Sequence, residues 1–212
     1  MLMSKFMKRL IVMLLMLSPY VSANKSFEGV ITYKIELESR NGKLPIEVLR
    51  QIYGEELKVF YKYGYTKHVY IGGDGEWEVY DSAKNKQYLK MRGNPEIDVL
   101  DGSDESRVLK GVLLTDSTVT VLDKNTQFLT IQYQDDIESK YWFSSEIYID
   151  PSQFEKLQFG YLNQYWDKAK APYLKHERDH GDWVVTHVAI TVEEKALDTS
   201  VFLIGSLVEG RR

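Results

Sequence analysis

A run of alternating apolar and polar residues at positions 27–37 reads FEGVITYKIEL. In an extended strand successive side chains point to opposite faces, so alternation of this kind predicts a strand with one buried face. The apolar residues that would share the buried face are Phe27, Ile31, Tyr33, Ile35 and Leu37. Working outward from this segment, we predict that the chain is mainly β.

Further alternating segments follow along most of the chain, separated by short polar turns. Gly72-Gly73-Asp74-Gly75 is a strong hairpin signal, because these residues adopt positive φ at low cost. Connections this short cannot cross over to a parallel strand, so the sheet is predicted to be antiparallel. The expected strands are residues 57–63, 68–71, 76–80, 87–91, 107–113, 117–122, 127–133, 140–149, 173–178 and 183–192, and residues 94–106 are expected to form a loop with at most a helical turn.

Two segments have helical spacing instead. After Pro45, the apolar residues Ile46, Leu49 and Ile52 recur at intervals of three, and Gly54 ends the pattern. Between residues 154 and 165 a second helical stretch is interrupted by Gly160. Residues 197–203 are expected to pack as a tail against the sheet.

The first 23 residues have the pattern of a secretory signal peptide. Lys5, Lys8 and Arg9 precede the apolar residues 10–17, and Val21-Ser22-Ala23 has the small residues of a cleavage site. The apolar run is too short to cross a bilayer, which needs about 20 residues. We therefore expect cleavage after Ala23, a single domain over residues 24–212 and a periplasmic location.

Charge and composition exclude several kinds of chemistry. The chain has 27 basic and 31 acidic residues, and loss of Lys5, Lys8 and Arg9 would leave a net charge near minus seven. An acidic protein is poorly suited to nucleic acid or to anionic lipid surfaces. The absence of cysteine excludes a cysteine nucleophile and a disulfide framework. No transmembrane segment and no cofactor are predicted.

The histidines are the first residues to consider as metal ligands or catalysts. His176, Arg178 and His180 lie at period two and would share a strand face, but two histidines do not complete a zinc site. A solvated hairpin tip is the favoured interpretation. His68 and His187 are isolated in the sequence and are expected to have no catalytic role. The chain has no G-x-S-x-G turn for a serine nucleophile, so no catalytic and no metal-binding residue is predicted.

Aromatic residues are abundant, at 13% with 15 tyrosines, and many fall on alternating strand positions. Cross-strand aromatic packing would explain this excess without any function. A curved sheet lining a cavity for an apolar ligand would explain it equally well. Periodicity does not separate the two explanations.

The order of elements resembles the periplasmic lipoprotein-carrier superfamily of the LolA and LolB type, and more closely its secreted bacterial relatives of unknown function. The resemblance is carried by the signal peptide, by the first strand with Phe27-Glu28-Gly29-Val30-Ile31-Thr32-Tyr33, and by two later motifs, Tyr141-Trp142-Phe143 before Ile147-Tyr148-Ile149-Asp150-Pro151 and Leu197-Asp198-Thr199-Ser200-Val201-Phe202. It implies a curved antiparallel sheet that forms an incomplete barrel, capped by short helices, around an apolar cavity that accepts acyl chains. The carriers use an arginine near the cavity mouth, and the sequence assigns no arginine to that position.

The leading hypothesis is an exported, noncatalytic binding protein that holds a lipid or an acylated peptide in the half-barrel, with a role similar to a lipoprotein carrier. The candidate cavity residues are Ile31, Tyr33, Ile35, Val59, Tyr61, Trp77, Val79, Leu129, Ile131 and Tyr133. One alternative is an interaction or sensor module that binds another envelope protein through a sheet edge or an exposed apolar patch. Another is an envelope hydrolase with His176 and His180 as the first candidates. Oligomeric state is left open.

Overall fold

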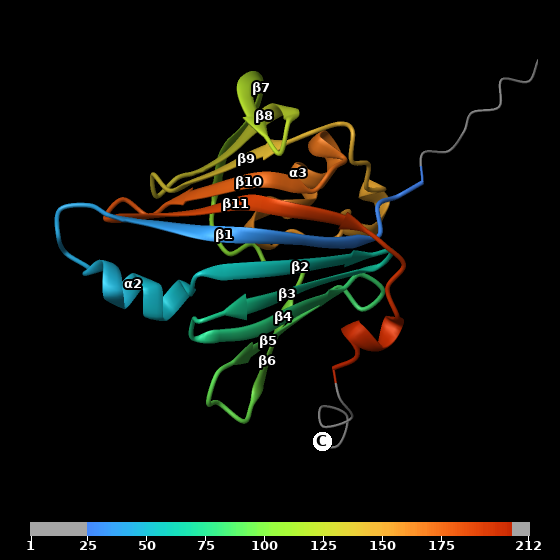
Figure 1. Ribbon diagram of the computed structural model, residues 1–212, viewed down its shortest axis with the longest axis horizontal. Coiled ribbons are helices and arrows are strands. Elements are labelled where there is room, and N and C mark those ends of the chain that lie inside the picture. Colours follow the sequence, from blue (N-terminus) through green and yellow to red (C-terminus); the bar gives the residue numbers. More distant parts are fainter. Residues whose placement is uncertain (1–24, 205–212) are drawn as a thin grey trace, which may run out of the picture.

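The computed structural model describes residues 25–204, so the predicted signal peptide lies outside the described residues. Eleven strands form one sheet in the order β6-β5-β4-β3-β2-β1-β11-β10-β9-β8-β7, with β1 and β11 at its centre (Figure 1). Every neighbouring pair is antiparallel. Because β6 and β7 form two edges that do not pair with each other, the sheet is not closed. The predicted curved antiparallel sheet is confirmed.

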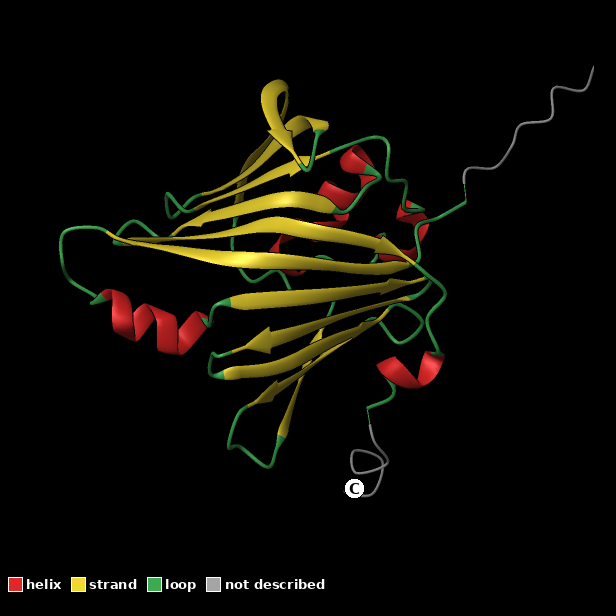
Figure 2. Cartoon of the chain, in the orientation of Figure 1, coloured by secondary structure: helices red, strands yellow, loops and turns green. Residues whose placement is uncertain are grey.

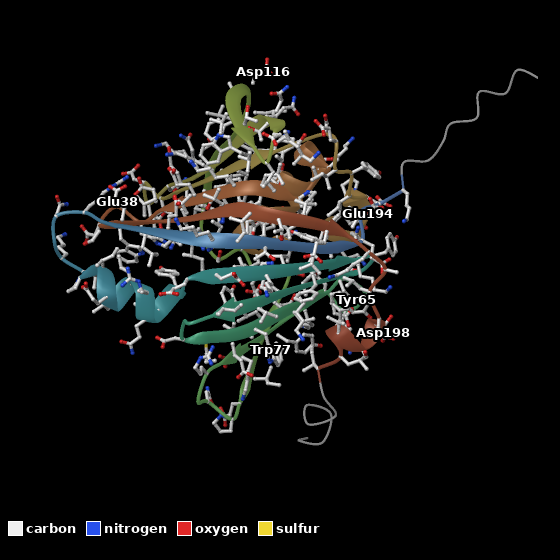
Figure 3. All side chains as sticks on the ribbon, in the orientation of Figure 1. Glu38, Tyr65, Trp77, Asp116, Glu194 and Asp198 are labelled. Atoms are coloured by element: carbon white, nitrogen blue, oxygen red, sulfur yellow. The ribbon has the colours of Figure 1, made fainter. Side chains whose placement is uncertain are left out.

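Most of the strands, on both sides of the centre, lie where the alternation predicted them. Glu38 and Glu194, labelled in Figure 3, lie near opposite ends of the central pair. The strands are β1 (Gly29–Ser39), β2 (Glu56–Lys62), β3 (Tyr65–Ile71), β4 (Gly75–Asp81), β5 (Lys86–Met91), β6 (Ile97–Asp101), β7 (Leu109–Val121), β8 (Lys124–Tyr133), β9 (Glu138–Phe143), β10 (Tyr173–Asp179) and β11 (Trp183–Glu194).

Three predictions about strands were wrong. Residues 94–106 contain β6, where Ile97, Val99 and Leu100 are interrupted by aspartates that remain acceptable on an exposed edge strand. The two strands predicted over residues 107–122 are one strand, β7, with an irregular pairing between Asp116 and Thr120. The strand predicted over residues 140–149 ends at Phe143, and the residues beyond it turn away from the sheet so that Ile149 donates its N–H to the carbonyl of Lys170.

The helical elements are short and cover different parts of the sheet (Figure 2). The predicted helix after Pro45 is α2 (Ile46–Tyr53), which buries Leu49 and ends at Gly54. The second helical stretch is divided as predicted, because Gly160 has φ +60° between two helical pieces. The stretch comprises η1 (Pro151–Phe154), η2 (Phe159–Tyr161) and α3 (Leu162–Ala169), and η3 (Thr199–Phe202) follows β11.

The segment from η1 to α3, called here the cover, lies over the concave face of the sheet. It is joined to both arms of the sheet by hydrogen bonds. Gln153 Oε1 accepts from the N–H of Gly64 in the β2–β3 turn at 2.7 Å, and Tyr133 of β8 donates its hydroxyl to the carbonyl of Gly160 at 2.9 Å. The link from β6 to β7, residues 102–108, runs between the two edges and accepts the Gln158 N–H at the Gly102 carbonyl. Cover and link together enclose the concave side.

The convex face carries a smaller apolar contact with the C-terminal η3. Phe202 is buried and lies 5.5 Å from the ring of Tyr65, and the Lys67 Nζ donates to the carbonyl of Val201. Figure 3 labels Tyr65, Trp77 and Asp198 in this region. The packed tail predicted at residues 197–203 is therefore confirmed.

Candidate functional site

A cavity of about 210 Å³ lies between the concave sheet face and the cover. Strands from both arms of the sheet contribute to it, because the curvature turns β3–β5 toward β8–β11. The apolar and aromatic lining residues are Leu57, Tyr61, Tyr80, Tyr133, Tyr141, Phe154, Leu157, Phe159, Leu162, Tyr165, Trp166 and Tyr173. The polar lining residues are Thr66, His68, Tyr70, Glu78, Gln87, Ser139, His176, Arg178 and His187, and Gly160 completes the wall.

The aromatic rings at the cover end pack closely against one another. Phe154 of η1 is stacked on Trp166 of α3 with ring centroids 4.2 Å apart, and Tyr141 lies 4.5 Å from Tyr165. The phenol of Tyr165 donates to the carbonyl of Ala171 at 2.7 Å. Such hydrogen bonds satisfy the polar tip and leave the ring face for apolar contact. This end of the cavity is an apolar wall.

Burial keeps the lining tyrosines neutral. It raises the pKa of Tyr61, Tyr141, Tyr165 and Tyr173 well above the ordinary phenol value, because the charged phenolate is poorly solvated there. Beneath them, Tyr33 donates its hydroxyl to the Tyr173 carbonyl at 2.7 Å. These lining tyrosines therefore carry no charge at any physiological pH.

Three of the four histidines meet at the other end of the cavity. His176 of β10 is the cross-strand partner of His187 of β11, and their ring centroids are 5.6 Å apart. His68 reaches the same cavity from β3, on the opposite arm, beside its own cross-strand partner Glu78. Arg178 lies two residues beyond His176 on the same face of β10. The curvature of the sheet thus gathers residues from β3, β4, β10 and β11.

The histidine pKa values are lowered in this environment. Burial is the largest cause for His176, and the positive charges of His187 and Arg178 add to it, so its pKa lies well below 6.5. Burial likewise lowers the pKa of His187 to about 4 and lowers that of His68, which Glu78 partly opposes. At neutral pH these imidazoles are uncharged, and each has one donor and one acceptor nitrogen.

Hydrogen-bond partners are distributed unevenly among the polar groups. Glu78 accepts from the Tyr70 hydroxyl at 3.3 Å and from Gln87 Nε2 at 3.2 Å. Over residues 25–204, the buried side-chain nitrogen and oxygen atoms that lack a protein partner are Gln87 Oε1, His176 Nε2, Arg178 Nε and His187 Nδ1. All four residues line this one cavity.

One sequence-based interpretation of these residues was wrong. His176 and Arg178 do not form a solvated hairpin tip, because the inner face of β10 is turned into the cavity. His68 and His187 are isolated in the sequence but not in space. The sequence showed that His176 and Arg178 share one face of a strand, but it did not show that this face points into the cavity. His180 lies apart from this group, stacked on Trp183 at 4.7 Å, and burial lowers its pKa to about 4.

The structure divides the ten predicted cavity residues into three groups. Tyr61 and Tyr133 line the cavity. Six others share the concave face and are buried in the core next to it, namely Ile31, Tyr33, Ile35, Val59, Leu129 and Ile131. Val79 and Trp77 lie on the convex face, since their cross-strand partners Lys67 and Val69 alternate with the lining residues Thr66, His68 and Tyr70.

Other surfaces of the described part of the chain differ from this cavity. A larger but shallower groove of about 550 Å³ borders Lys25, Lys124 and Glu146. The edge strand β7 exposes Leu113 and Leu114, so the edge-pairing alternative stays a prediction. Between residues 25 and 204, no group of three His, Asp or Glu side chains is close enough to form a metal site. The same residues include no helix long and apolar enough to span a membrane.

Comparison with known proteins gave only distant likenesses. No family model and no curated protein matches the sequence. Among solved structures, PNGF-II is similar at 15% identity and a TM-score of 0.47 over 84% of this chain, which spans 30% of that protein. The lipoprotein LppX of Mycobacterium tuberculosis has 10% identity and a TM-score of 0.37, covering 80% of this chain and 89% of LppX. A LolA superfamily protein of Nitrosomonas europaea has 7% identity and a TM-score of 0.38, covering 84% and 90%.

Proposed function

We propose that this protein is a noncatalytic binding protein that holds an apolar ligand, or the apolar part of a larger one, between the concave sheet face and the cover. The observation that carries the proposal is the aromatic wall formed by Tyr61, Phe154, Tyr165 and Trp166 on one side of the cavity. Ligand pockets are typically concave, mostly apolar and equipped with a few polar groups that fix orientation. The finer proposal is an exported protein with a lipoprotein-carrier-like role, for which the predicted signal peptide is the support.

The cavity volume limits what it holds in this conformation. At about 210 Å³ it is smaller than the roughly 300–1,000 Å³ of most drug-sized ligand sites. A dry cavity of about 150 Å³ is enough for a benzene molecule. A straight chain of roughly eight carbons is therefore the appropriate scale, and a full-length acyl chain would require the cover to move outward.

The proposal is tested by adding 1-octanol to the purified protein and measuring binding by calorimetry and by tryptophan fluorescence, to which Trp166 contributes. We expect saturable binding with one site, because each buried methylene contributes about 0.8 kcal/mol. Tyr61→Trp, which overfills the cavity, should weaken binding at least tenfold. Leu162→Trp fills the same space from α3 and serves as a second variant in case Tyr61→Trp fails to fold.

Tyr63→Trp is the matched control, because this side chain lies just beyond β2 and is 63% exposed. It should bind 1-octanol as the unmodified protein does. Absence of saturable binding, or equal affinities for all four proteins, would refute an internal apolar site. If 1-octanol binds saturably, native mass spectrometry with extraction of any copurified molecule would identify the natural ligand class.

A further inference from the structure

The geometry points to an anion subsite at the polar end of the cavity, in which Arg178 binds the carboxylate of an amphipathic ligand whose chain lies along the aromatic wall. This inference deepens the proposed function and rests on it. It concerns a residue and a ligand group that the sequence did not identify. Three observations carry it: the lack of an ion-pair partner for Arg178 among residues 25–204, the clustering of unpartnered nitrogens, and the apolar wall beside them.

Arg178 has no carboxylate partner within the described chain. None of the ion pairs among residues 25–204 includes its guanidinium. Glu78 lines the same cavity but accepts from Tyr70 and Gln87. An arginine stays charged in a protein, and its planar fork matches a carboxylate with two parallel hydrogen bonds. No carboxylate of residues 25–204, Glu78 included, lies within ion-pair distance of Arg178, so its guanidinium is free to take an anionic group of a ligand.

The unpartnered atoms surround the same space. Nε of Arg178 is a donor, and the neutral imidazoles of His176 and His187 each offer a ring nitrogen that a change of tautomer makes a donor. Gln87, which is 4% exposed and lies on the opposite arm of the sheet, has an unpartnered oxygen that only accepts hydrogen bonds and so does not bind the carboxylate. Buried polar groups in folded proteins nearly always have a partner. The three unpartnered nitrogens on β10 and β11 border one cavity and indicate a site that is completed by an acceptor group of a ligand.

The neighbouring wall selects the remainder of the ligand. Tyr141 is stacked on His176 with centroids 4.5 Å apart, and Tyr165 follows Tyr141 at the same separation. A chain that starts at Arg178 therefore meets aromatic rings and not water. A medium-chain carboxylic acid of roughly eight carbons combines this anionic head with the volume available.

The test compares octanoate, 1-octanol and acetate on the same protein by calorimetry at pH 7.5 and constant salt. Octanoate and 1-octanol differ only in the head group, and acetate supplies the head group without the chain. We expect octanoate to bind at least tenfold tighter than 1-octanol, and acetate to bind at least tenfold more weakly than octanoate. Arg178→Met should remove the preference for octanoate over 1-octanol.

Two further variants keep the test decisive. Arg178→Lys retains the charge without the fork and should keep part of the preference, and it also covers the case in which Arg178→Met does not fold. Arg50→Met is the matched control, since the Arg50 side chain is 54% exposed on α2, and it should bind all three compounds normally.

The outcomes separate this inference from the function on which it rests. Equal affinity for octanoate and 1-octanol, or a preference that survives in Arg178→Met, would overturn the anion subsite and leave the apolar site intact. Acetate binding as tightly as octanoate would overturn the assignment of an amphipathic ligand. Failure of both octanoate and 1-octanol to bind would refute the proposed function itself.

Discussion

At the scale of single residues, the main feature is the group of half-buried histidines around Arg178. A histidine in a strand does not by itself indicate a function, because the same residue is equally compatible with a surface or a core position. His176 and His187 acquire their properties from one another, from Arg178 and from the cavity that removes their bulk solvent. Both lowered pKa values mean that the folded protein favours the neutral imidazole.

This predicts a pH dependence of stability. Below about pH 6.5, His176 and His187 bind protons in the unfolded chain but stay neutral in the folded protein, because their pKa values are lowered there. The free energy of unfolding should therefore fall as pH decreases from 6.5 toward 4. For His187 we expect a loss of about 1 kcal/mol between pH 7 and pH 5, a value reduced because its side chain is only partly shielded from solvent. Urea denaturation at both pH values measures it.

His187→Gln should unfold with a smaller difference between pH 7 and pH 5 than the unmodified protein. Thr186→Gln is the control, because Thr186 is the neighbouring outward-facing residue of β11 and leaves every histidine in place. If His187→Gln retained the full pH dependence, other titrating groups would be responsible for it.

At the scale of elements, the junctions between helix and strand decide how the sheet arms are placed. Gly54 ends α2 with φ +81° and ψ −161°, a backbone region that is essentially restricted to glycine. A Cβ atom at this position would lie 2.4 Å from the carbonyl oxygen of Ile71 and 2.8 Å from the N–H nitrogen of Gly73. The helix end is therefore packed directly against the β3–β4 hairpin.

We predict that Gly54→Ala destabilises the protein by about 3 kcal/mol or more, because both the dihedral angle and the close backbone approach are lost. Gly42 supplies the control. Its φ is +64°, but nothing lies within 4 Å of the point that a Cβ atom would occupy, so Gly42→Ala should cost only about 1 kcal/mol of dihedral strain. Chemical denaturation of the two variants gives the comparison. Equal losses would show that the contact with Ile71 is unimportant.

At the scale of the whole molecule, the cover holds the two arms of an open sheet around the cavity. Phe154 is 1% exposed and stacks on Trp166 within the cover and on Tyr80 of β4, at 4.2 Å and 6.0 Å between centroids. Tyr133 ties the same cover to β8 through Gly160. Loss of the contact on one arm should therefore affect the shape of the cavity as well as stability.

Phe154→Ala should lower the free energy of unfolding by about 3–5 kcal/mol, as expected for a fully buried phenylalanine, and should weaken 1-octanol binding at least tenfold. Phe128→Ala is the control, since Phe128 packs on Trp142 at 4.8 Å on the convex face. It should lose stability without losing affinity for 1-octanol. Unchanged binding by Phe154→Ala would show that the cover does not shape the site.

The candidate site was only partly predictable. The aromatic strand positions indicated a lining, and Tyr61 and Tyr133 are part of it. Trp77 and Val79 were assigned to the wrong face, because successive residues of a strand point to opposite faces and an error of one residue exchanges them. The polar end was missed because its members come from two groups of strands, β3–β5 and β10–β11, that are distant from each other in sequence, and nothing local distinguishes an inward histidine from an outward one.

The sequence by itself determined most of the strands, the antiparallel connections, the helix after Pro45 and the break at Gly160. These features depend on alternation and on backbone preferences, which act over a few residues. Only the tertiary structure decided which face is concave, where β6 pairs, and how His68 on β3 comes to face His187 and Arg178. The curvature and the strand register depend on every strand of the sheet, and together they bring polar residues from distant parts of the sequence to one end of the cavity.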